Sequence, residues 1–574
     1  MKKYILIILG ILSALIIVIS LFFVKHDSST TEETVYWDSS QTAYIYLNSD
    51  NITLENSNAK VKGQVVTITD GGYYEISGTL TDGQIIVDSE DDVYITLNGV
   101  DITCSNSSAI YIENANNVII TLAEGNTNTL TDGSDYDVDD SGEPDGTLFS
   151  KDDLTINGTG ELVINANYAD GIVSKDDLVI ESGTITVNAA DDGIRGKDSV
   201  TILDGVINID ANADGIKSTN DTDDEKGYVL IKNGTITIVA GEDGIQAATY
   251  VEIEDGNFDI ETGGGSSNSS TSSSWGNWNG SSSSTAKGIK ATDLITINAG
   301  VFNINSSDDS LHTNGEMVIN GGTFVINSGD DGMHADNELT INDGTIDIQK
   351  SYEGIESADI VLNGGNISIV ASDDGVNGAG GADSSGTSSN RAGGGMESTT
   401  SGSLTITGGY IYVDAAGDGL DVNGGITMSG GTVIVNGPTD NGNGALDYDS
   451  AFNITGGTLI AAGSSGMAQA LSSTSSQYSV LVNFTSTYSA NTIICIQDSS
   501  GNNVLTFAPS KKFSSIAFSS SSLKKGETYT VYVNGTSTGA VTGGSYTSGT
   551  LYKSFTISSI TTTVGSTSSM NMGR

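Results

Sequence analysis

Residues 170–191 read DGIVSKDDLVIESGTITVNAAD, and residues 192–213 read DGIRGKDSVTILDGVINIDANA. Both stretches are 22 residues long and start with the same Asp-Gly-Ile tripeptide. Variants of this tripeptide recur with their central residues at positions 171, 193, 215, 244, 288, 310, 332, 354, 375, 419 and 444. Five of the ten steps between these positions are 22 residues and one is 21, so this part of the chain is an internal repeat.

Each repeat holds about three short runs that alternate apolar and polar residues, and such runs are typical of half-buried strands. Val200–Ile202 and Ile207–Ile209 are two of them. A unit of this size cannot bury its own apolar side chains, so the units must stack on one another. We therefore predict an all-β fold, a parallel β-helix with about 22 residues and three short strands per coil. Helical repeats are excluded because no period of about 3.6 residues appears, and β-propeller units are about 40 residues or longer.

Changes in composition divide the chain into four parts. We assign them as a signal-anchor or signal peptide (1–30), a linker with an N-terminal cap (31–65), the parallel β-helix (66–470) and a C-terminal β-rich cap domain (471–574). Two Ser/Gly-rich insertions interrupt the β-helix, at residues 263–285 and 378–402.

The N-terminal segment indicates the compartment. Lys2 and Lys3 precede an uninterrupted apolar run, Tyr4–Val24, which is long enough to cross a bilayer as a helix. It is either an uncleaved anchor or a cleaved signal peptide, and both place the rest of the chain outside the membrane. We expect an extracellular protein, secreted or anchored at the cell surface through its N-terminal helix.

The composition excludes several classes of protein. With 22 Lys+Arg against 72 Asp+Glu, the formal net charge is −50. Nucleic acid is therefore not expected as a partner, because phosphate binding needs clustered cations. The only two cysteines, Cys104 and Cys495, exclude a disulfide framework and predict two free thiols.

Stacking of the repeats places equivalent residues in columns about 4.8 Å apart. The first column consists of the acidic residue that precedes each central glycine, often with a second Asp before it. Neighbouring carboxylates at this spacing repel each other, and carboxylate oxygens are suited to Ca²⁺. We predict that calcium binds between coils, with ligands drawn from Asp170, Asp191, Asp192, Asp214, Asp243, Asp308, Asp309, Asp330, Asp331, Asp373, Asp374 and Asp418. Alternatively, each Asp caps its own turn and is solvated.

The second column is the residue that follows each Ile, and it is basic in the middle of the chain and acidic towards the C-terminal end. Cations beside metal-binding carboxylates suit an acidic polysaccharide, whose carboxylates pair with Arg or Lys and with bridging calcium. The residues predicted to contact the glycan are Arg195, Lys197, Lys217, Lys290, His312 and His334. The alternative is that these cations only neutralise the adjacent Asp column.

Two of the three tryptophans, Trp275 and Trp278, lie in the first Ser/Gly-rich insertion. Exposed indole rings in a polar loop can stack on sugar faces, so both are further candidates for glycan binding. The alternative is a disordered loop in which the pair collapses locally.

Three stretches carry a resemblance to a known family: Leu148–Ile156, Asp170–Leu178 and Asp191–Asp198. They resemble a bacterial family of extracellular carbohydrate-binding proteins, formerly a domain of unknown function and described as cellulose- and pectin-binding. The resemblance extends to the tail around Lys524–Tyr529. It implies a right-handed parallel β-helix, similar to pectate lyases, with bound calcium and a plant cell-wall polysaccharide as partner.

Two other functions stay open. Asp191–Ile194 also looks like the calcium motif of a pectate-lyase family, in which a nearby Lys or Arg removes a proton, a role open here to Arg195 or Lys197. The motif recurs along the solenoid, which suits a long binding surface better than one reaction centre, so an enzyme is the less favoured interpretation. A surface adhesin or structural spacer is the third.

Overall fold

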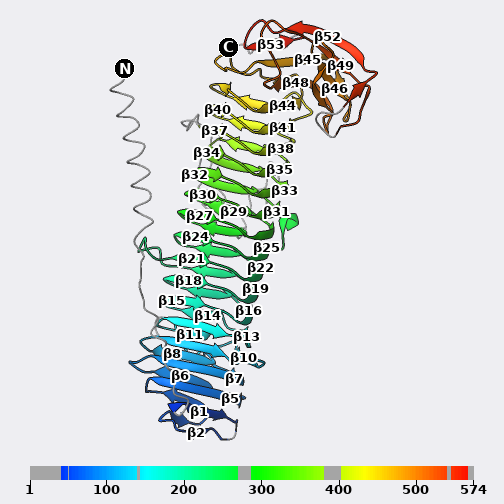
Figure 1. The fold of residues 1–574 in the computed structure, drawn as a ribbon. Helices are drawn as coiled ribbons and strands as arrows, with labels where there is room; N and C mark the ends of the chain where they lie inside the picture. Colours follow the sequence, from blue (N-terminus) through cyan, green and yellow to red (C-terminus); the bar gives the residue numbers. More distant parts are fainter. Residues whose placement is uncertain are drawn as a thin grey trace, which may run out of the picture. The chain divides into compact units, whose positions relative to one another are not determined.

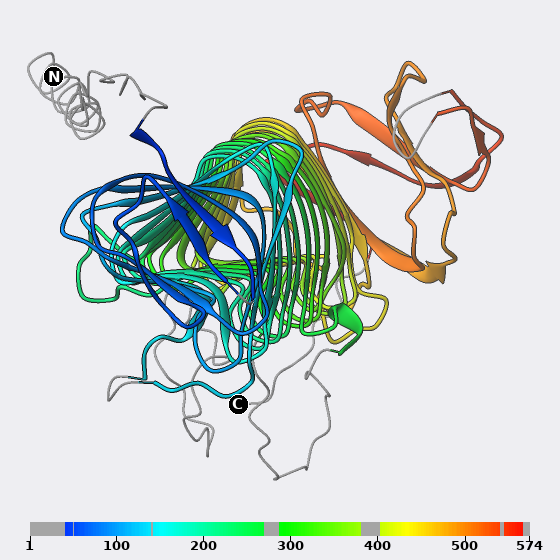
Figure 2. The same cartoon turned by 90° about the horizontal axis from the view of Figure 1, so that it is seen from below.

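Each repeat folds into one coil of a parallel β-solenoid, and the coils stack around a common centre (Figures 1 and 2). The computed structural model describes residues 41–49, 51–138, 142–268, 286–379, 402–539 and 545–565. Residues 43–574 form one compact unit, and all of the described fold lies in it apart from two residues. The expected membrane segment, residues 1–30, lies outside the described residues. Within the described part, no helix has the length and apolar character needed to cross a membrane.

Three parallel sheets run along the solenoid, and each coil contributes one strand to each sheet. The first sheet holds the strands that follow the Asp-Gly motif. Its strands are β4 (Val65–Ile68), β6 (Gln84–Asp88), β8 (Ile110–Asn114), β11 (Gly146–Ser150), β14 (Asp170–Ser174), β17 (Ile194–Gly196), β20 (Ile216–Ser218), β23 (Ile245–Ala247), β26 (Ile289–Ala291), β29 (Leu311–Thr313), β36 (Val376–Gly378), β39 (Leu420–Val422) and β42 (Leu446–Tyr448).

The second sheet follows after a short turn. Its strands are β9 (Val118–Leu122), β12 (Leu154–Gly158), β15 (Asp177–Ile180), β18 (Ser199–Ile202), β21 (Tyr228–Ile231), β24 (Tyr250–Ile253), β27 (Leu294–Ile297), β30 (Glu316–Ile319), β37 (Ser403–Ile406), β40 (Gly425–Met428) and β43 (Phe452–Ile454). Two longer strands, β32 (Met333–Ile341) and β34 (Ile355–Leu362), belong to the first sheet at their start and to the second at their end.

The third sheet closes each coil. Its strands are β10 (Thr127–Asp132), β13 (Glu161–Ala166), β16 (Thr184–Ala189), β19 (Val206–Ala211), β22 (Thr235–Ala240), β25 (Asn257–Thr262), β28 (Val301–Ser306), β31 (Thr323–Ser328), β33 (Thr345–Ser351), β35 (Asn366–Ala371), β38 (Tyr410–Ala415), β41 (Thr432–Asn436) and β44 (Thr458–Gly463). The turn from the second sheet into the third needs a glycine, because its backbone is in the left-handed region, with φ +136° at Gly205.

The first coils are less regular. β5 (Gly72–Leu80) and β7 (Val93–Cys104) run through both the second and the third sheets. β1 (Ala43–Leu47) pairs in parallel with β5, so the first rung lies within the segment expected to be linker and cap. Two short strands add antiparallel pairs, β2 (Thr53–Glu55) on β1 and β3 (Lys60–Lys62) on β4.

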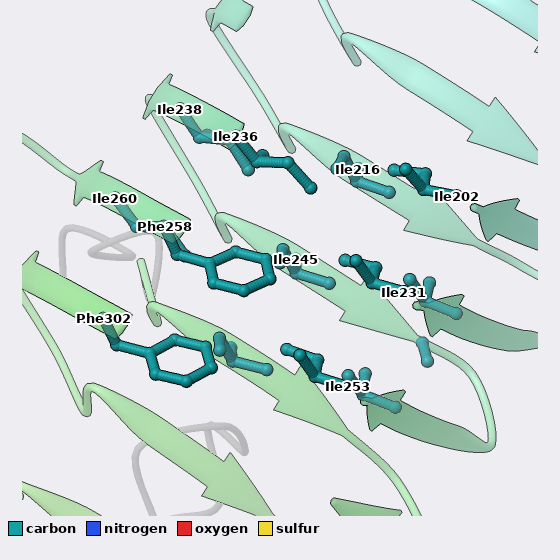
Figure 3. Packing of buried hydrophobic residues seen from close by; sticks show 14 of the residues in the cluster. Ile202, Ile216, Ile231, Ile236, Ile238, Ile245, Ile253, Phe258, Ile260 and Phe302 are labelled. Atoms are coloured by element: carbon teal, nitrogen blue, oxygen red, sulfur yellow. The ribbon is translucent and has the colours of Figure 1, made fainter. Parts of the chain in front are cut away.

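The interior is a continuous column of Ile, Val and Leu side chains (Figure 3). Alternate residues of each strand point inward, as Ile185, Val187 and Ala189 of β16 do. Phe258, Phe302 and Phe324 stack in successive coils with ring centroids 4.6 Å apart. Because the burial runs from coil to coil, no single repeat is stable alone.

The C-terminal residues form a separate β-structure that pairs with the last coil. β48 (Phe513–Ser519) lies antiparallel between β44 and β45 (Ser479–Tyr488), and β53 (Thr561–Val564) pairs with β45. A second sheet orders β47 (Asn503–Phe507), β46 (Ile494–Gln497), β49 (Thr528–Val533) and β52 (Thr550–Thr556), and β50 (Thr536–Ser537) pairs with β51 (Tyr546–Thr547). Because β48 occupies the free edge of β44, the backbone groups of that edge are satisfied. Cys104 and Cys495 are both free and buried, as predicted.

An asparagine ladder joins the turns between the second and third sheets. The side-chain Nδ2 of Asn320 donates to Asn298 Oδ1, that of Asn342 to Asn320 and that of Asn363 to Asn342, at 2.8–2.9 Å. Each amide is held by its neighbours in both directions, so the ladder links consecutive coils.

Replacing Asn342 with Ala is therefore expected to lower the free energy of unfolding by about 1 kcal/mol, the usual net value of a hydrogen bond. Urea denaturation of both proteins measures it. Asn327→Ala is the matched control, because Asn327 lies on the outward side of β31 and has no side-chain hydrogen bond to a described residue. An equal loss in the control would show that the ladder adds nothing.

Candidate functional site

The two predicted columns lie side by side at the turn from the third sheet into the first. In the first sheet Val173 pairs with Arg195, Arg195 with Lys217, Lys290 with His312 and His312 with His334. The ladder continues through Glu356 and Asn377 to Asp421 and Asp447. The register of the second column is therefore the one that the repeat spacing predicts.

The carboxylates of the first column bond to the backbone of the next coil. Asp170 Oδ1 accepts the N–H of Asp192 at 3.1 Å, Asp192 Oδ1 that of Asp214 at 3.1 Å, and Asp214 Oδ1 that of Asp243 at 2.7 Å. The same bond recurs from Asp309 to Asp331, and from Asp374 to Asp418. One oxygen of each of these carboxylates thus supports the stacking, and the second oxygen takes part in none of these backbone bonds.

In the N-terminal part of the column that second oxygen is held by a side-chain cation. We call this part the basic segment, and it consists of Asp170, Asp192, Asp214 and Asp243 with Arg195, Lys217 and Lys290. Arg195 Nη2 lies 2.5 Å from Asp170 Oδ2 and 2.6 Å from Asp145 Oδ2. Lys217 Nζ lies 2.7 Å from Asp214 and 3.1 Å from Asp192, and Lys290 Nζ lies 2.7 Å from Asp243. A metal ion in this segment would have to displace these cations.

Arg195 is strongly fixed in this arrangement. Burial lowers the pKa of its guanidinium, but the carboxylates of Asp170 and Asp145 outweigh burial and hold the pKa above its ordinary value. The side chain is 14 % exposed, so it offers little surface to a ligand.

The middle of the column contains two stacked histidines. We call it the histidine segment, and it consists of Asp309, His312, Asp331, His334 and Glu356. The two imidazole rings are 4.9 Å apart, and both residues are buried. His312 Nδ1 is 2.8 Å from Asp309 Oδ2, and that oxygen also binds the buried Lys287 Nζ at 2.7 Å. Neither histidine presents a ring at the surface.

The C-terminal part of the column has no such cations. We call it the acidic segment, and it consists of Asp374, Asp418 and Asp421. No ion pair to these three carboxylates occurs within the described part of the chain. One oxygen from each lies within 4.8 Å of the others, close enough to hold one metal ion.

Burial and the repulsion between neighbouring carboxylates raise the pKa values in this segment. Burial raises the pKa of Asp374 to about 7, and the nearby Asp373 and Asp418 add to it. Burial also raises the pKa of Asp418 and of Asp421 to about 6. These are the shifts expected for carboxylates that share a site without a counter-ion.

The remaining candidates are spread around these segments. Asp191 and Lys197 are exposed, and Asp308, Asp330 and Asp373 are half-buried. Asp308 is 3.2 Å from the ammonium of Lys287. Trp275 and Trp278 lie outside the described residues.

Three residues that are not among the predicted calcium or glycan ligands take part in the site, although Asp145 belongs to an acidic loop that the sequence offers as a weaker calcium candidate. Asp145 completes the pairing of Arg195, Asp336 contacts His334, and Asp421 joins Asp374 and Asp418. Asp421 was visible as the acidic end of the second column. Asp145 and Asp336 lie outside both columns, so no repeat position marks them.

Comparisons with known proteins find a family match, a curated relative and a similar solved structure. Residues 62–332 match the family described as carbohydrate-binding domain-containing proteins. A curated relative from Acetivibrio thermocellus, also described as a carbohydrate-binding domain-containing protein, is 42 % identical over 152 residues. The match covers 26 % of this chain and 53 % of the relative, so the chain spans about half the length of that protein.

One solved structure is also similar. Its title is "Structure of the polysaccharide lyase-like protein from C. thermocellum, Gadolinium derivative". It is 42 % identical in sequence, and the match covers 39 % of this chain and 92 % of that chain with a TM-score of 0.38.

Proposed function

We propose that the protein is an extracellular, calcium-dependent polysaccharide-binding protein, with residues 1–30 exporting it or anchoring it in the membrane. The family match supports a carbohydrate partner. The observation that carries the calcium dependence is the acidic segment, where three converging carboxylates lack a counter-ion among the described residues. Its ligands would be plant cell-wall glycans, either acidic and pectin-like or cellulose.

The residues of the acidic segment fit calcium. Ca²⁺ takes six to eight oxygen ligands in a flexible geometry, and carboxylate and amide oxygens are its usual donors. Asn377, one coil before Asp421, is 6 % exposed, and its Oδ1 has no hydrogen-bond partner among the described residues. Gly417 leaves room for the carboxylates, because a Cβ there would lie 2.3 Å from Asp374 Oδ1 and 2.4 Å from Asp373 Oδ1.

The number of oxygen ligands that calcium needs also favours an acidic glycan. Three carboxylates do not fill the coordination of Ca²⁺, and further oxygens must come from water or a ligand. A uronate carboxylate supplies charged oxygens, whereas cellulose offers only hydroxyl groups. A bound calcium ion would therefore bridge the acidic segment and an acidic polysaccharide more strongly than it would hold cellulose.

The structure gives no support to Arg195 as the base of a lyase reaction. An arginine can accept a proton only after its guanidinium has lost one, and the carboxylates of Asp170 and Asp145 hold the guanidinium charged. Lys197, the other candidate base, is exposed and lies in the turn that follows β17. We therefore propose binding without cleavage.

Pull-down of the chain lacking residues 1–30 on insoluble polygalacturonate and on cellulose tests this function. With millimolar calcium we expect retention on polygalacturonate, at least a tenfold weaker apparent affinity in excess chelator, and no absorbance from unsaturated product. Asp418→Asn should lose the calcium dependence, and Asp214→Asn in the basic segment should keep it. Product formation would identify a lyase, and failure to bind either glycan would leave an adhesin or spacer.

A further inference from the structure

The ring of His334 is surrounded by carboxylates on both sides. Its Nδ1 lies 3.3 Å from Asp331 Oδ2 and 3.3 Å from Glu356 Oε2, and its Nε2 lies 3.0 Å from Asp336 Oδ1. Asp331 and His334 come from one coil and Glu356 from the next. The imidazole is 1 % exposed, and the carboxylates of Asp331 and Glu356 are 7 % and 20 % exposed.

The two contacts of Nδ1 are long for hydrogen bonds between charged groups. Such bonds measure roughly 2.7–2.9 Å, and an N–H that is shared between two oxygens makes a longer and weaker bond to each of them. In contrast, ligands at about 2.0–2.1 Å from a tetrahedral Zn²⁺ are separated from each other by roughly 3.3–3.4 Å. The spacing of Nδ1 from both oxygens therefore matches a shared metal ion.

The opposite side of the ring has the partner that metal-binding histidines use. A histidine that binds a metal through one nitrogen usually donates its other N–H to a carboxylate, which fixes the tautomer. Asp336 accepts from Nε2 in this way. With protons on both nitrogens the ring is an imidazolium that pairs with all three carboxylates. With the proton on Nε2 alone, a metal dication in place of the Nδ1 proton would bind the lone pair of Nδ1 and the two carboxylate oxygens.

His312 in the preceding coil differs from His334 because its carboxylate partner is already paired with a lysine. Its carboxylate partner, Asp309, already binds the buried ammonium of Lys287 at 2.7 Å. No Lys or Arg within the described residues lies in ion-pair contact with Asp331, Glu356 or Asp336. The His334 side of the histidine segment therefore has unbalanced negative charge, and the His312 side does not.

We infer that Asp331, His334 and Glu356 form a site for a transition-metal dication of the Zn²⁺ type, separate from the proposed calcium site. An imidazole nitrogen favours Zn²⁺ over Ca²⁺, which prefers oxygen ligands alone. Asp336 is the positioning residue that orients His334. Three protein ligands leave the fourth position of a tetrahedral ion open to water or to a glycan oxygen.

Binding of Zn²⁺ and Co²⁺ to the metal-stripped full chain, in excess calcium, tests the site. We expect one strongly bound Zn²⁺ per chain, and for Co²⁺ the intense visible absorption of a tetrahedral complex. His334→Gln and Glu356→Gln should each weaken Zn²⁺ binding at least 100-fold, and Asp336→Asn about tenfold. His312→Gln is the matched control and should change the affinity less than threefold.

Each result of the metal-binding experiment either supports or excludes the proposed zinc site. Absence of stoichiometric Zn²⁺ binding to the wild-type chain would overturn the site, as would equal losses in the His312 and His334 variants. Far-ultraviolet circular dichroism identifies any variant that fails to fold, and the Co²⁺ spectrum of the wild-type chain then decides alone. Because calcium is present throughout, failure of the zinc site leaves the proposed polysaccharide binding intact.

Discussion

Replacing Gly193 with Ala is expected to destabilise the solenoid by about 3 kcal/mol, the upper end of what overpacking a core costs. A Cβ at this position would lie 2.6 Å from the carbonyl oxygen of Gly215 in the next coil and 2.5 Å from Ile209 Cγ2. Both contacts are far shorter than van der Waals distance. The carbonyl belongs to the strand ladder, so it cannot move without breaking coil-to-coil hydrogen bonds.

The same close approach recurs along the repeat. A Cβ at Gly215, Gly244, Gly354 or Gly375 would lie 2.3–2.6 Å from a carbonyl oxygen of the following coil. Gly193 itself does not have a left-handed backbone. The glycine of the Asp-Gly-Ile motif is therefore required by the packing of neighbouring coils and not by its own dihedral angles.

Several coils carry a side chain at this position, and Ser310 is one of them. Ser310 replaces the glycine, and the bond from the N–H of Leu311 to Gly332 O is 3.4 Å long, compared with 3.0 Å for the equivalent bond from Ile194 to Gly215 O. At Gln84, which also carries a side chain at this position, the equivalent bond from Ile85 to Ala109 O is 3.0 Å long, so a Cβ does not widen the ladder in every coil.

Ser310→Ala is the matched control for Gly193→Ala, because it keeps the Cβ that the chain already accommodates. Differential scanning calorimetry of both variants measures the shift in melting temperature. We expect a clear decrease for Gly193→Ala and little change for Ser310→Ala beyond the loss of the hydroxyl bond to Ser306. Equal shifts would show that the contact with Gly215 does not limit the packing.

The repeat spacing was sufficient to predict the columns but not their chemistry. Equivalent residues 22 positions apart must pair in a parallel stack, so the register from Arg195 to Lys217 follows from the sequence. What each carboxylate contacts does not follow. The ammonium of Lys217 lies between Asp214 in its own coil and Asp192 in the coil before, and this depends on side-chain rotamers that no spacing encodes.

The alternative interpretations of the Asp column also turn out to apply to different coils. The carboxylate oxygens that accept a backbone N–H have a structural role, but they bond the next coil, whereas the capping interpretation expected each Asp to cap its own turn. In the basic segment, side-chain cations neutralise the carboxylates, as the alternative for the second column states. Among the described residues, Asp374, Asp418 and Asp421 have no such partner, and they lie where the second column has become acidic. The sequence contained this change of sign, but only the contacts show its consequence.

Metal-free protein should lose stability in its acidic segment as the pH rises. The folded pKa values are about 7 for Asp374 and about 6 for Asp418 and Asp421, whereas an unfolded Asp titrates near 3.9. Between these values the folded chain binds more protons, so unfolding becomes easier with rising pH. The contribution is complete below about pH 4 and is lost as the pH passes through 6 to 7.

Replacing Asp374, Asp418 and Asp421 together with Asn should therefore stabilise the metal-free chain at pH 7.5 and abolish its response to calcium. Asn keeps the oxygen that accepts the backbone N–H of the next coil, so the stacking is preserved.

In the wild-type chain, calcium at 100 times its dissociation constant should add about 2.7 kcal/mol to the free energy of unfolding. Thermal unfolding at pH 4.5 and 7.5, in chelator and in calcium, measures all four states. Asp214→Asn, whose carboxylate is paired with Lys217, should respond to calcium as the wild type does. A triple variant that is less stable than the wild type in chelator at pH 7.5 would show that the three carboxylates do not repel each other. A triple variant that calcium still stabilises would place the ion elsewhere in the column.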